Sequence, residues 1–336
     1  MNCQDLLLGT AIGDAFGAGV EFQDRDWIRA QVDFSMLVNA RAKIPVPAEQ
    51  LSAFTQNYHA WDYTDDTEMT IGVCKALCSK HPFSEDLLVK FWEQEYQLGM
   101  QQKGYGRNGH GSMSWYYNGE KTIHEIRAFQ QDRPNPGNAP AMRAVPLGLL
   151  PPSLINSYAA INAQATHPNI NAILSSQCIA RAAEFLLVLK GNPSELITYC
   201  MEQVPLNQEY QFYLKQVQTL SAYKQLSNAH FEILCGPQPI QTPYFLAGIQ
   251  GLPSDSKYTT GAVLYLLQQS TTPFDGLQKA IHLGGDVDSV ASIVTGILAG
   301  SQGLDSLPAY MLAQVEGVAY LREQGKLLAA FLVKLN

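Results

Sequence analysis

Helical periodicity is the feature that most constrains how this chain can fold. Apolar residues recur at spacings of three and four through long segments, as they do in helices with a buried face. Period-two segments joined by hairpin turns, which would predict strands, are scarce. The sequence therefore predicts an all-α protein. We expect helices within residues 2–22, 65–80, 84–102, 169–191, 192–204, 260–270, 274–285 and 286–300.

Two stretches interrupt this pattern. Residues 31–60 show no clean period and contain two prolines, and residues 102–140 are rich in Gly, Asn and Pro. Irregular segments of this length in a helical domain are usually functional or disordered. No low-complexity linker divides the chain, so we expect one compact multi-helix domain over residues 1–336.

Composition narrows the classes of function. The chain has 336 residues, of which 46% are hydrophobic and 15% charged, as in a globular protein with a large core. Its 30 acidic and 22 basic residues give a net charge of −8, so nucleic acid is not an expected partner. No apolar run is long enough for a membrane helix, and no basic segment precedes the apolar N-terminus as in a signal peptide. The six cysteines lack disulfide-framework spacing, so we expect reduced thiols and a cytoplasmic protein.

An acidic cluster lies at residues 62–68, which read "DYTDDTE". Four of these seven side chains are acidic, and the nearest basic residue is Lys75. Burying like charges together costs several kcal/mol for each ion. The cluster is therefore either a solvated surface turn or a site that holds a cation.

A second cluster opens the segment "GGDVDSVASIVTGILAG", residues 284–300. Asp286, Asp288 and Ser289 follow two glycines at the predicted start of a helix. Asp and Ser are ordinary N-cap residues, and acids there complement the helix dipole. This cluster alone therefore does not establish a cation site. A site is expected only if the fold brings this cluster next to the acidic cluster at residues 62–68.

Small residues predict that the N-terminal and 286–300 helices pack closely. Gly9, Gly13 and Gly17 recur at every fourth position, and Gly296 and Gly300 repeat the same spacing. Glycine within a helix costs about 1 kcal/mol relative to alanine, so its repetition calls for a packing reason. If the first helix continues to residue 21, Asp14 and Glu21 share a face, and Glu21 lies near an acid-lined site.

The donors at such a site are all oxygen atoms. Mg²⁺, Mn²⁺ and Ca²⁺ prefer oxygen ligands, whereas zinc and copper prefer His or Cys. Four carboxylates balance two divalent ions, and paired metal ions commonly catalyse hydrolysis. We therefore expect two divalent cations that prefer oxygen ligands, with Mg²⁺, Mn²⁺ and Ca²⁺ all open at this point. The candidate ligands are Thr64, Asp65, Asp66, Asp286, Asp288 and Ser289.

Five motifs in order resemble the ADP-ribosylglycohydrolase family, which includes the dinitrogenase reductase-activating glycohydrolase and the ADP-ribosyl-acceptor hydrolases. They are "GTAIGDAFGAGVEF", "TDDT", "GNAPAMRAVPLG", "THPN" and "GGDVDSVASIVTGILAG". The resemblance implies an all-α domain with a two-metal site between helix ends, in which the two divalent cations are Mg²⁺ or Mn²⁺. It also implies hydrolysis of the bond between ADP-ribose and an acceptor, with an ADP-ribosylated protein or a small ADP-ribose conjugate as substrate.

The resemblance also assigns residues. Asp65, Asp66 and Glu21 are the catalytic candidates, the first two also being metal ligands. The ADP-ribose cleft is expected to include Gly137, Asn138, Met142 and His167. Arg143 is a candidate partner for the pyrophosphate, and His282 is expected to be structural. Candidates in the loop region are Tyr105, Trp115, Tyr116 and Tyr117 for stacking and His110 for the site.

The sequence departs from the family pattern at several positions. Ser289 and Val287 stand where threonine is usual, and Pro140 where a small residue is common. No acid occurs between Glu95 and Glu120, where arginine-acting bacterial members carry one, so the acceptor stays open, with arginine as one candidate. Two other classes of function also stay open: a non-catalytic binding or structural member, and a metal-dependent phosphohydrolase with the same oxygen ligands.

Overall fold

The computed structural model describes residues 1–40, 59–103, 112–242 and 245–335. Within these residues the fold is almost entirely helical, which confirms the all-α prediction. The strands β1 (Ile240–Thr242) and β2 (Phe245–Ile249) form one antiparallel pair. The α-helices are α1 (Cys3–Ala18), α2 (Arg25–Gln31), α4 (Asp65–Cys78), α5 (Glu85–Lys103), α6 (Met113–Tyr117), α7 (Ile123–Gln131), α8 (Ala139–Met142), α9 (Pro152–Gln164), α10 (Ile170–Ala183), α11 (Leu196–Gln203), α12 (Gln208–Gln218), α13 (Asn228–Cys235), α14 (Ser256–Gln269), α15 (Pro273–Ile281), α16 (Val287–Gln302), α17 (Ala309–Gln314) and α18 (Val318–Leu335). Short turns of tighter or wider helix are η2 (Val145–Leu149), η3 (Glu184–Val188), η4 (Pro193–Glu195) and η5 (Tyr223–Gln225).

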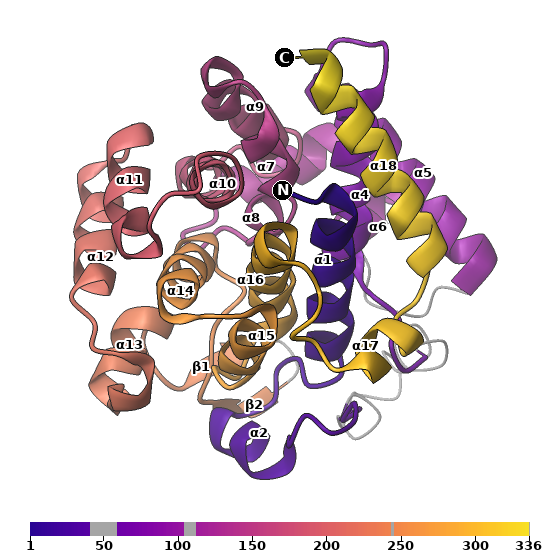
Figure 1. Ribbon diagram of the computed structural model, residues 1–336. Helices are drawn as coiled ribbons and strands as arrows, with labels where there is room; N and C mark the ends of the chain where they lie inside the picture. The colour runs from indigo at the N-terminus through magenta and orange to yellow at the C-terminus, as the bar shows by residue number, and fades with distance from the viewer. Residues whose placement is uncertain (41–58, 104–111, 243–244, 336) are drawn as a thin grey trace.

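Helices α1 and α16 stand side by side at the centre of the molecule (Figure 1). A Cβ atom built on Gly9 would lie 2.5 Å from the Cβ of Ala299, and one on Gly13 would lie 2.5 Å from the carbonyl carbon of Ala291. Real Cβ atoms essentially never come so close to other heavy atoms. The glycine spacing therefore exists because the two backbones touch, which confirms the predicted packing.

The other helices surround this pair. α18 packs against α1 and α4, while α14 and α15 pack against α16 (Figure 1). Nearly every residue of α1 and α16 is buried, so both helices are apolar on all sides, as expected for helices inside a core. Their arrangement fixes the C-terminal end of α1 beside the N-terminal end of α16, where the acidic residues lie.

Several local predictions were wrong. Helix α1 ends at Ala18, so Glu21 lies in the turn that follows and not on the helix. The segment 112–140 is not one irregular loop, because it contains α6, α7 and the start of α8. Helix α7 begins with a capping box in which Thr122 and Glu125 exchange side-chain and backbone hydrogen bonds. Helix α14 begins at Ser256, four residues before the predicted start.

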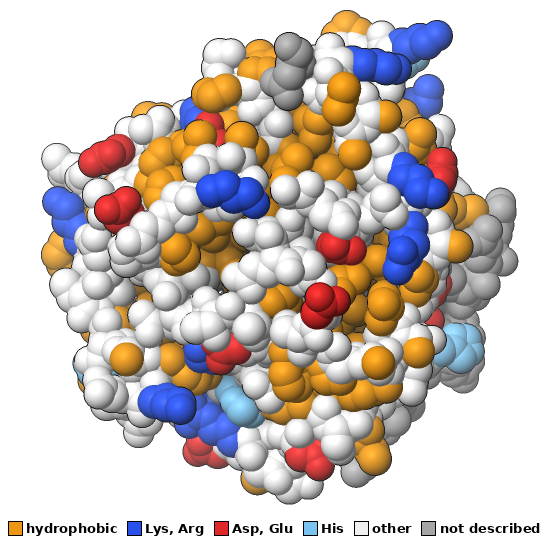
Figure 2. Space-filling view, in the orientation of Figure 1, with side chains coloured by type: hydrophobic (Ala, Val, Ile, Leu, Met, Phe, Trp, Pro, Cys, Tyr) orange, Lys and Arg blue, Asp and Glu red, His pale blue; other side chains and the backbone are white. Residues whose placement is uncertain are grey.

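On the face shown in Figure 2, acidic and basic side chains are spread among polar and apolar ones. None of the helices in the described part of the chain is both long and apolar enough to cross a membrane. All six cysteines are free thiols, five of them buried, as expected from their spacing.

Candidate functional site

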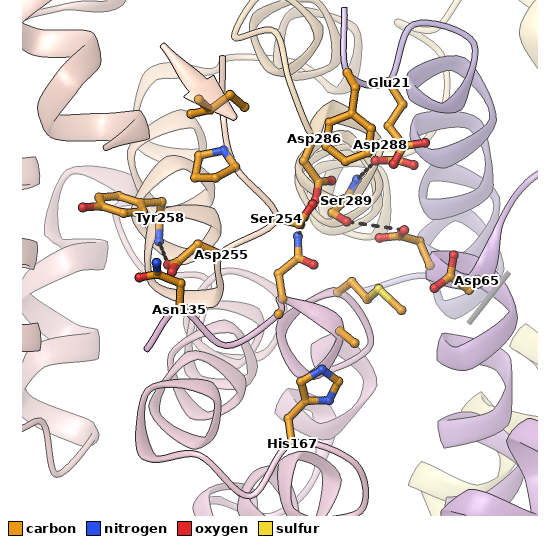
Figure 3. A pocket seen from close by; sticks show the side chains of 18 of the residues that line it. Glu21, Asp65, Asn135, His167, Ser254, Asp255, Tyr258, Asp286, Asp288 and Ser289 are labelled. Carbon is orange, nitrogen blue, oxygen red and sulfur yellow. Dashed lines mark hydrogen bonds between the residues drawn. The ribbon is translucent and has the colours of Figure 1, made fainter. Parts of the chain in front are cut away.

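A cavity of about 740 Å³ lies where the ends of α1, α4, α8 and α16 converge. Its acidic wall comes from the turn after α1, the first turn of α4 and the first turn of α16 (Figure 3). The opposite walls come from residues 133–143, from His167 in the turn between α9 and α10, and from the segments 235–240 and 253–258. The acidic lining residues are Glu21, Asp65, Asp66, Asp255, Asp286 and Asp288.

Two consecutive glycines place Asp286 at the N-terminus of α16, where it is the N-cap residue. Gly284 and Gly285 have φ values of +71° and +77°, a conformation that other residues adopt only with strain. Gly285 lies between two other segments: its N–H donates to the carbonyl of Gln23, and a Cβ there would lie 2.5 Å from the nitrogen of Leu252. The Asp286 N–H donates to the carbonyl of Leu252 at 2.8 Å. The chain thus enters α16 through a gap that only glycine fits.

Asp14 joins α1 to the start of α4. Its carboxylate accepts hydrogen bonds from both the backbone N–H and the hydroxyl of Thr64, and from both groups of Thr67, at 2.7–3.0 Å. It therefore caps α4 from a different helix, while the side chain of the N-cap residue Thr64 makes no capping bond of its own. The hydroxyl of Thr64 donates its proton to Asp14 and keeps its lone pairs, although Thr64 does not line the cavity.

The carboxylates form two groups that share Asp288. Oxygens of Asp14, Asp66 and Asp288 all lie within 4.8 Å of one another, as do oxygens of Glu21, Asp286 and Asp288. Hydroxyls from α16 complete the cluster. The Ser289 Oγ lies 3.4 Å and the Ser292 Oγ 3.1 Å from the carboxylate of Asp66. The structure thus brings together the two acidic segments singled out in the sequence, and Asp65 lines the same cavity.

Burial and mutual repulsion disfavour the charged forms of these acids. The pKa of Asp66 is raised well above its ordinary value, first by burial and then by Asp14, Asp65 and Asp286. The pKa of Asp288 is likewise raised well above its usual range by burial and then by Glu21, Asp286 and Asp66. Within the described residues, no Lys or Arg forms an ion pair with Asp14, Asp66, Asp286 or Asp288.

These observations fit divalent cations. The donors are carboxylate and hydroxyl oxygens, which suit Mg²⁺, Mn²⁺ or Ca²⁺ and not the softer metals. Buried carboxylates without basic partners need a positive charge to offset their repulsion. Two acidic groups that share Asp288 could hold a pair of neighbouring ions, and Asp66, Asp286, Asp288 and Ser289 line the cavity there with oxygen atoms.

The wall facing the acids carries the predicted substrate residues. The Asn138 amide donates to the carboxylate of Asp286 at 3.3 Å and to the hydroxyl of Thr259 at 3.1 Å. Asn138 is the N-cap residue of α8, although its side chain makes no capping bond. Gly137, Met142 and His167 also line the cavity. The imidazole of His167 rises toward the middle of the cavity, opposite the acids (Figure 3). It does not cap α10, because Asn169 has that role.

The remaining candidates have other roles or lie away from the cavity. Arg143 is among the residues around the cavity, but its guanidinium is fully buried and donates to Asn162 and Thr166, so it is not free to pair with a pyrophosphate. Trp115, Tyr116 and Tyr117 do not line the cavity; Tyr117 stacks on Tyr96, and Trp115 contacts Phe129. The ring of His282 packs against Phe34, consistent with a structural role. Tyr105 and His110 lie outside the described residues.

Sequence reasoning missed several parts of the site, among them Asp14 and the walls formed by residues 235–240 and 253–258. Asp14 was noted only as a neighbour of Glu21, although an acid between the apolar residues in the middle of α1 is a signal of a buried polar role. The wall formed by Pro253, Ser254, Asp255 and Tyr258 was also missed. Its available signal was the cap residue Asp255, whose carboxylate accepts from the N–H groups of Lys257 and Tyr258 at the start of α14.

Comparison with known proteins identifies the family. The sequence model of the ADP-ribosylglycohydrolase family matches residues 2–335. The chain belongs to the ADP-ribosylglycohydrolase family.

Among curated members of this family, the chain is similar to the ADP-ribosylhydrolase ARH3 of Mus musculus, with 25% identity covering 93% of this chain and 86% of that protein. The corresponding protein of Homo sapiens is 24% identical, with coverages of 93% and 88%. A solved structure titled "ADP-ribosylglycohydrolase-related protein complex" superposes with a TM-score of 0.64 at 19% identity, covering 98% of this chain and 99% of that one. That likeness confirms the ADP-ribosylglycohydrolase fold.

Proposed function

We propose that this protein hydrolyses the glycosidic bond between the anomeric carbon of ADP-ribose and an acceptor, in a reaction that depends on two divalent cations, Mg²⁺ or Mn²⁺. The observation that carries the proposal is the sharing of Asp288 between two carboxylate groups at one end of a large cavity. The family membership supports ADP-ribose as the group that fills the rest of that cavity.

The acidic wall has residues for holding the ions. Asp66, Asp286 and Asp288 provide carboxylates and Ser289 provides a hydroxyl oxygen, and Asp14 is the third carboxylate of the group that contains Asp66 and Asp288. The predicted ligand Thr64 does not line the cavity and donates its hydroxyl proton to Asp14, while Asn138 donates to Asp286. When bound, a pair of divalent ions supplies Lewis-acid chemistry that orients ribose oxygens and polarises water. The acidic wall also favours the positive charge that develops on the sugar in an oxocarbenium-like transition state.

One carboxylate must accept the proton of the attacking water. In hydrolysis the water oxygen bonds to the anomeric carbon as the bond to the acceptor breaks, and the acceptor leaves with a proton. Asp66 is buried and in contact with Ser289 and Ser292, so we assign it to ion binding. Glu21 and Asp65 are half-buried at the cavity wall and are better placed to exchange protons.

Substitution of each residue distinguishes whether Glu21 or Asp65 is the general base. We expect either Glu21→Gln or Asp65→Asn to lower kcat by about 10²–10⁴-fold at saturating metal, as is typical for loss of a general base. Titration of each variant with Mn²⁺ controls for loss of the ions. If both variants keep the wild-type kcat, neither carboxylate is the base.

The substrate is an ADP-ribosylated protein or a small ADP-ribose conjugate. Arginine is one candidate acceptor among protein side chains, and the residues around the cavity do not select among acceptors. A panel of linkages, with free ADP-ribose measured by mass spectrometry, identifies the acceptor by which conjugate is cleaved.

The central test removes the charge of one proposed metal ligand, Asp286, while keeping the size of its side chain. Asp286→Asn keeps the shape of the side chain but loses its charge, and we expect release of ADP-ribose to fall by at least about 10²-fold. Asp305 is an exposed acid that follows the C-terminal end of α16, at the opposite end of that helix from Asp286. Asp305→Asn is therefore the matched control and should keep full activity. A chelator should abolish wild-type turnover, and added Mg²⁺ or Mn²⁺ should restore it.

Product identity distinguishes the alternatives. Free ADP-ribose supports the proposal, whereas release of phosphate or AMP would identify a phosphohydrolase that uses the same oxygen ligands. Binding of ADP-ribose with no turnover of any conjugate, with either ion, would identify a non-catalytic binding member of the family.

A further inference from the structure

A chain of hydrogen bonds runs from the buried Arg143 to the cavity. The Arg143 Nη2 donates to the hydroxyl of Thr166 at 2.7 Å, and that same hydroxyl lies 2.7 Å from Nδ1 of His167. Arg143 and Thr166 are fully buried, and His167 is 5% exposed. The three residues therefore connect the core behind the site to an imidazole that lines it.

Arg143 is fixed by contacts on every side of its guanidinium. Its Nε donates to the side-chain oxygen of Asn162 at 2.8 Å, and Nη2 also donates to the backbone carbonyl of Asn162 at 3.0 Å. The guanidinium lies over the ring of Trp92, 3.8 Å from the ring centre. Arginine has only donors, so every bond that it makes to Thr166 must use the Thr166 oxygen as acceptor.

Because the Thr166 oxygen accepts from Arg143, the Thr166 hydroxyl proton is left to donate to another partner. Among the described residues, Arg143 and His167 are the partners of that hydroxyl. If His167 Nδ1 carried the proton, the Thr166 oxygen would accept two bonds and its own proton would be buried without an acceptor. Buried donors without partners are strongly disfavoured. The Thr166 hydroxyl therefore donates to Nδ1.

We propose that Arg143 is a positioning residue that acts through Thr166 to hold His167 as the neutral tautomer with its proton on Nε2. A neutral imidazole that accepts at Nδ1 must donate at Nε2. Burial and the nearby charges of Arg143 and Arg133 lower the pKa of His167 well below its usual range, which is consistent with a neutral ring.

The Nε2–H group faces the ligand side of the cavity. A Cβ built on Gly137 would lie 3.2 Å from Nε2, so the absence of a side chain at residue 137 leaves this nitrogen open to the cavity. Nε2 has no hydrogen-bond partner within the described residues. This edge of His167 therefore presents a donor that suits an oxygen acceptor on the ligand. With the proposed function, that acceptor is an oxygen of the ADP-ribose moiety.

The tautomer can be read directly. In protein labelled with ¹⁵N at histidine, long-range ¹H–¹⁵N spectra distinguish a protonated from an unprotonated ring nitrogen, and His167→Gln assigns the signals by their loss. We expect wild-type His167 to show a protonated Nε2 and an unprotonated Nδ1 near neutral pH, without any ligand. A protonated Nδ1 would overturn the proposal.

A matched pair of variants tests the relay, by which we mean the chain of hydrogen bonds from Arg143 through Thr166 to His167. Thr166→Val keeps the shape of the side chain but removes the hydroxyl, and we expect mixed tautomers and binding of ADP-ribose weakened about tenfold, the effect of one lost hydrogen bond. Thr166→Ser keeps the hydroxyl and should retain the wild-type spectrum and affinity. Unchanged spectra and affinity in Thr166→Val would contradict the relay, and so would equal effects in both variants.

Arg143 is tested through the same readout. Arg143→Met keeps much of the stacking on Trp92 but removes the donors, and in folded protein we expect the His167 tautomers to mix as in Thr166→Val. A single Nε2–H tautomer in this variant would overturn the assignment of Arg143. The ligand-free spectra do not depend on the proposed function, so wild-type protein that fails to bind ADP-ribose but shows the predicted tautomer refutes that function and leaves the relay standing.

Discussion

The imidazole of His167 is a buried ring that the fold keeps neutral, and this has a consequence for stability. Burial, Arg143 and Arg133 all lower its pKa in the native state, whereas in the unfolded chain a histidine has a pKa of about 6.5. Below that pH the unfolded chain binds a proton that the native state does not. The free energy of unfolding therefore falls as the pH falls, by up to about 1.4 kcal/mol per pH unit well below pH 6.5, and this effect fades as the pH rises above about 7.

His167→Gln should lack this dependence. We expect the difference in unfolding free energy between wild type and His167→Gln to be constant above about pH 7 and to move in favour of the variant between about pH 6.5 and 5.5. His282, whose pKa is lowered by burial and Arg29, contributes equally to both proteins and cancels. Denaturant titrations at each pH measure the difference, and parallel stability curves would refute a neutral, buried His167.

At the residue scale, the candidate site residues that could be predicted from the sequence were acids with no basic residue nearby in the chain to neutralise them. Asp65 and Asp66 stand out because acids without nearby basic residues need a cation or water. Asp14 and Arg143 were harder to interpret, because a single charged residue in an apolar segment does not disclose its partner. Asp14 binds Thr64 and Thr67, some fifty residues away, and only the packing of α1 against α4 shows this.

At the scale of elements, the contact between α1 and α16 positions a proposed metal ligand. A Cβ built on Gly17 would lie 2.8 Å from the backbone nitrogen of Asp288, so a side chain there must push the first turn of α16 away. We expect Gly17→Ala to lower the unfolding free energy by about 1–3 kcal/mol, the usual cost of overpacking, despite the better helix propensity of alanine. Displacement of Asp288 should also weaken Mn²⁺ binding about tenfold or more.

Gly300→Ala is the control from the other end of the same interface. Its added Cβ would lie 3.0 Å from the Cβ of Leu6 and 3.2 Å from a methyl of Leu187, which are longer distances than those to the backbone at Gly17, and no site residue is near. We expect a smaller loss of stability and unchanged Mn²⁺ affinity. Denaturant unfolding and calorimetric titration make the comparison; equal Mn²⁺ affinity in both variants would show that the α1–α16 contact does not position Asp288.

Helices were predictable where the apolar pattern was strong, as in α1, α4 and α16. The helices α9, α12 and α18 were not predicted. Helix α12, "QEYQFYLKQVQ", is rich in glutamine and has only a narrow buried face formed by Tyr210, Tyr213, Leu214 and Val217. Short helices of this kind depend on tertiary packing more than on their own propensity, so the local sequence is a weak guide to them. The end of α1 was misplaced because the apolar residues Val20 and Phe22 continue the pattern beyond Ala18, where the helix ends.

For the whole molecule, folding assembles negative charge at the convergence of α1, α4 and α16, which lie far apart in sequence. In the absence of cations, this repulsion opposes folding, because the native state brings together Asp66, Asp286 and Asp288 while the unfolded chain separates them. Ions that bind only the native state must therefore stabilise it. At a concentration a hundred times Kd, one such ion adds about 2.7 kcal/mol to the free energy of unfolding.

We accordingly expect the melting temperature to rise with added Mg²⁺ or Mn²⁺, to fall after treatment with a chelator, and to recover when the ion returns. Asp286→Asn should melt at a higher temperature than wild type in chelator, because one repelling charge is gone, and should gain much less from added ion. Asp305→Asn should behave as wild type in both conditions. Thermal unfolding followed by circular dichroism measures all three proteins. A wild-type melting temperature that does not respond to either ion at millimolar concentration would show that the acidic convergence is not a metal centre, since binding to the native state cannot occur without stabilising it.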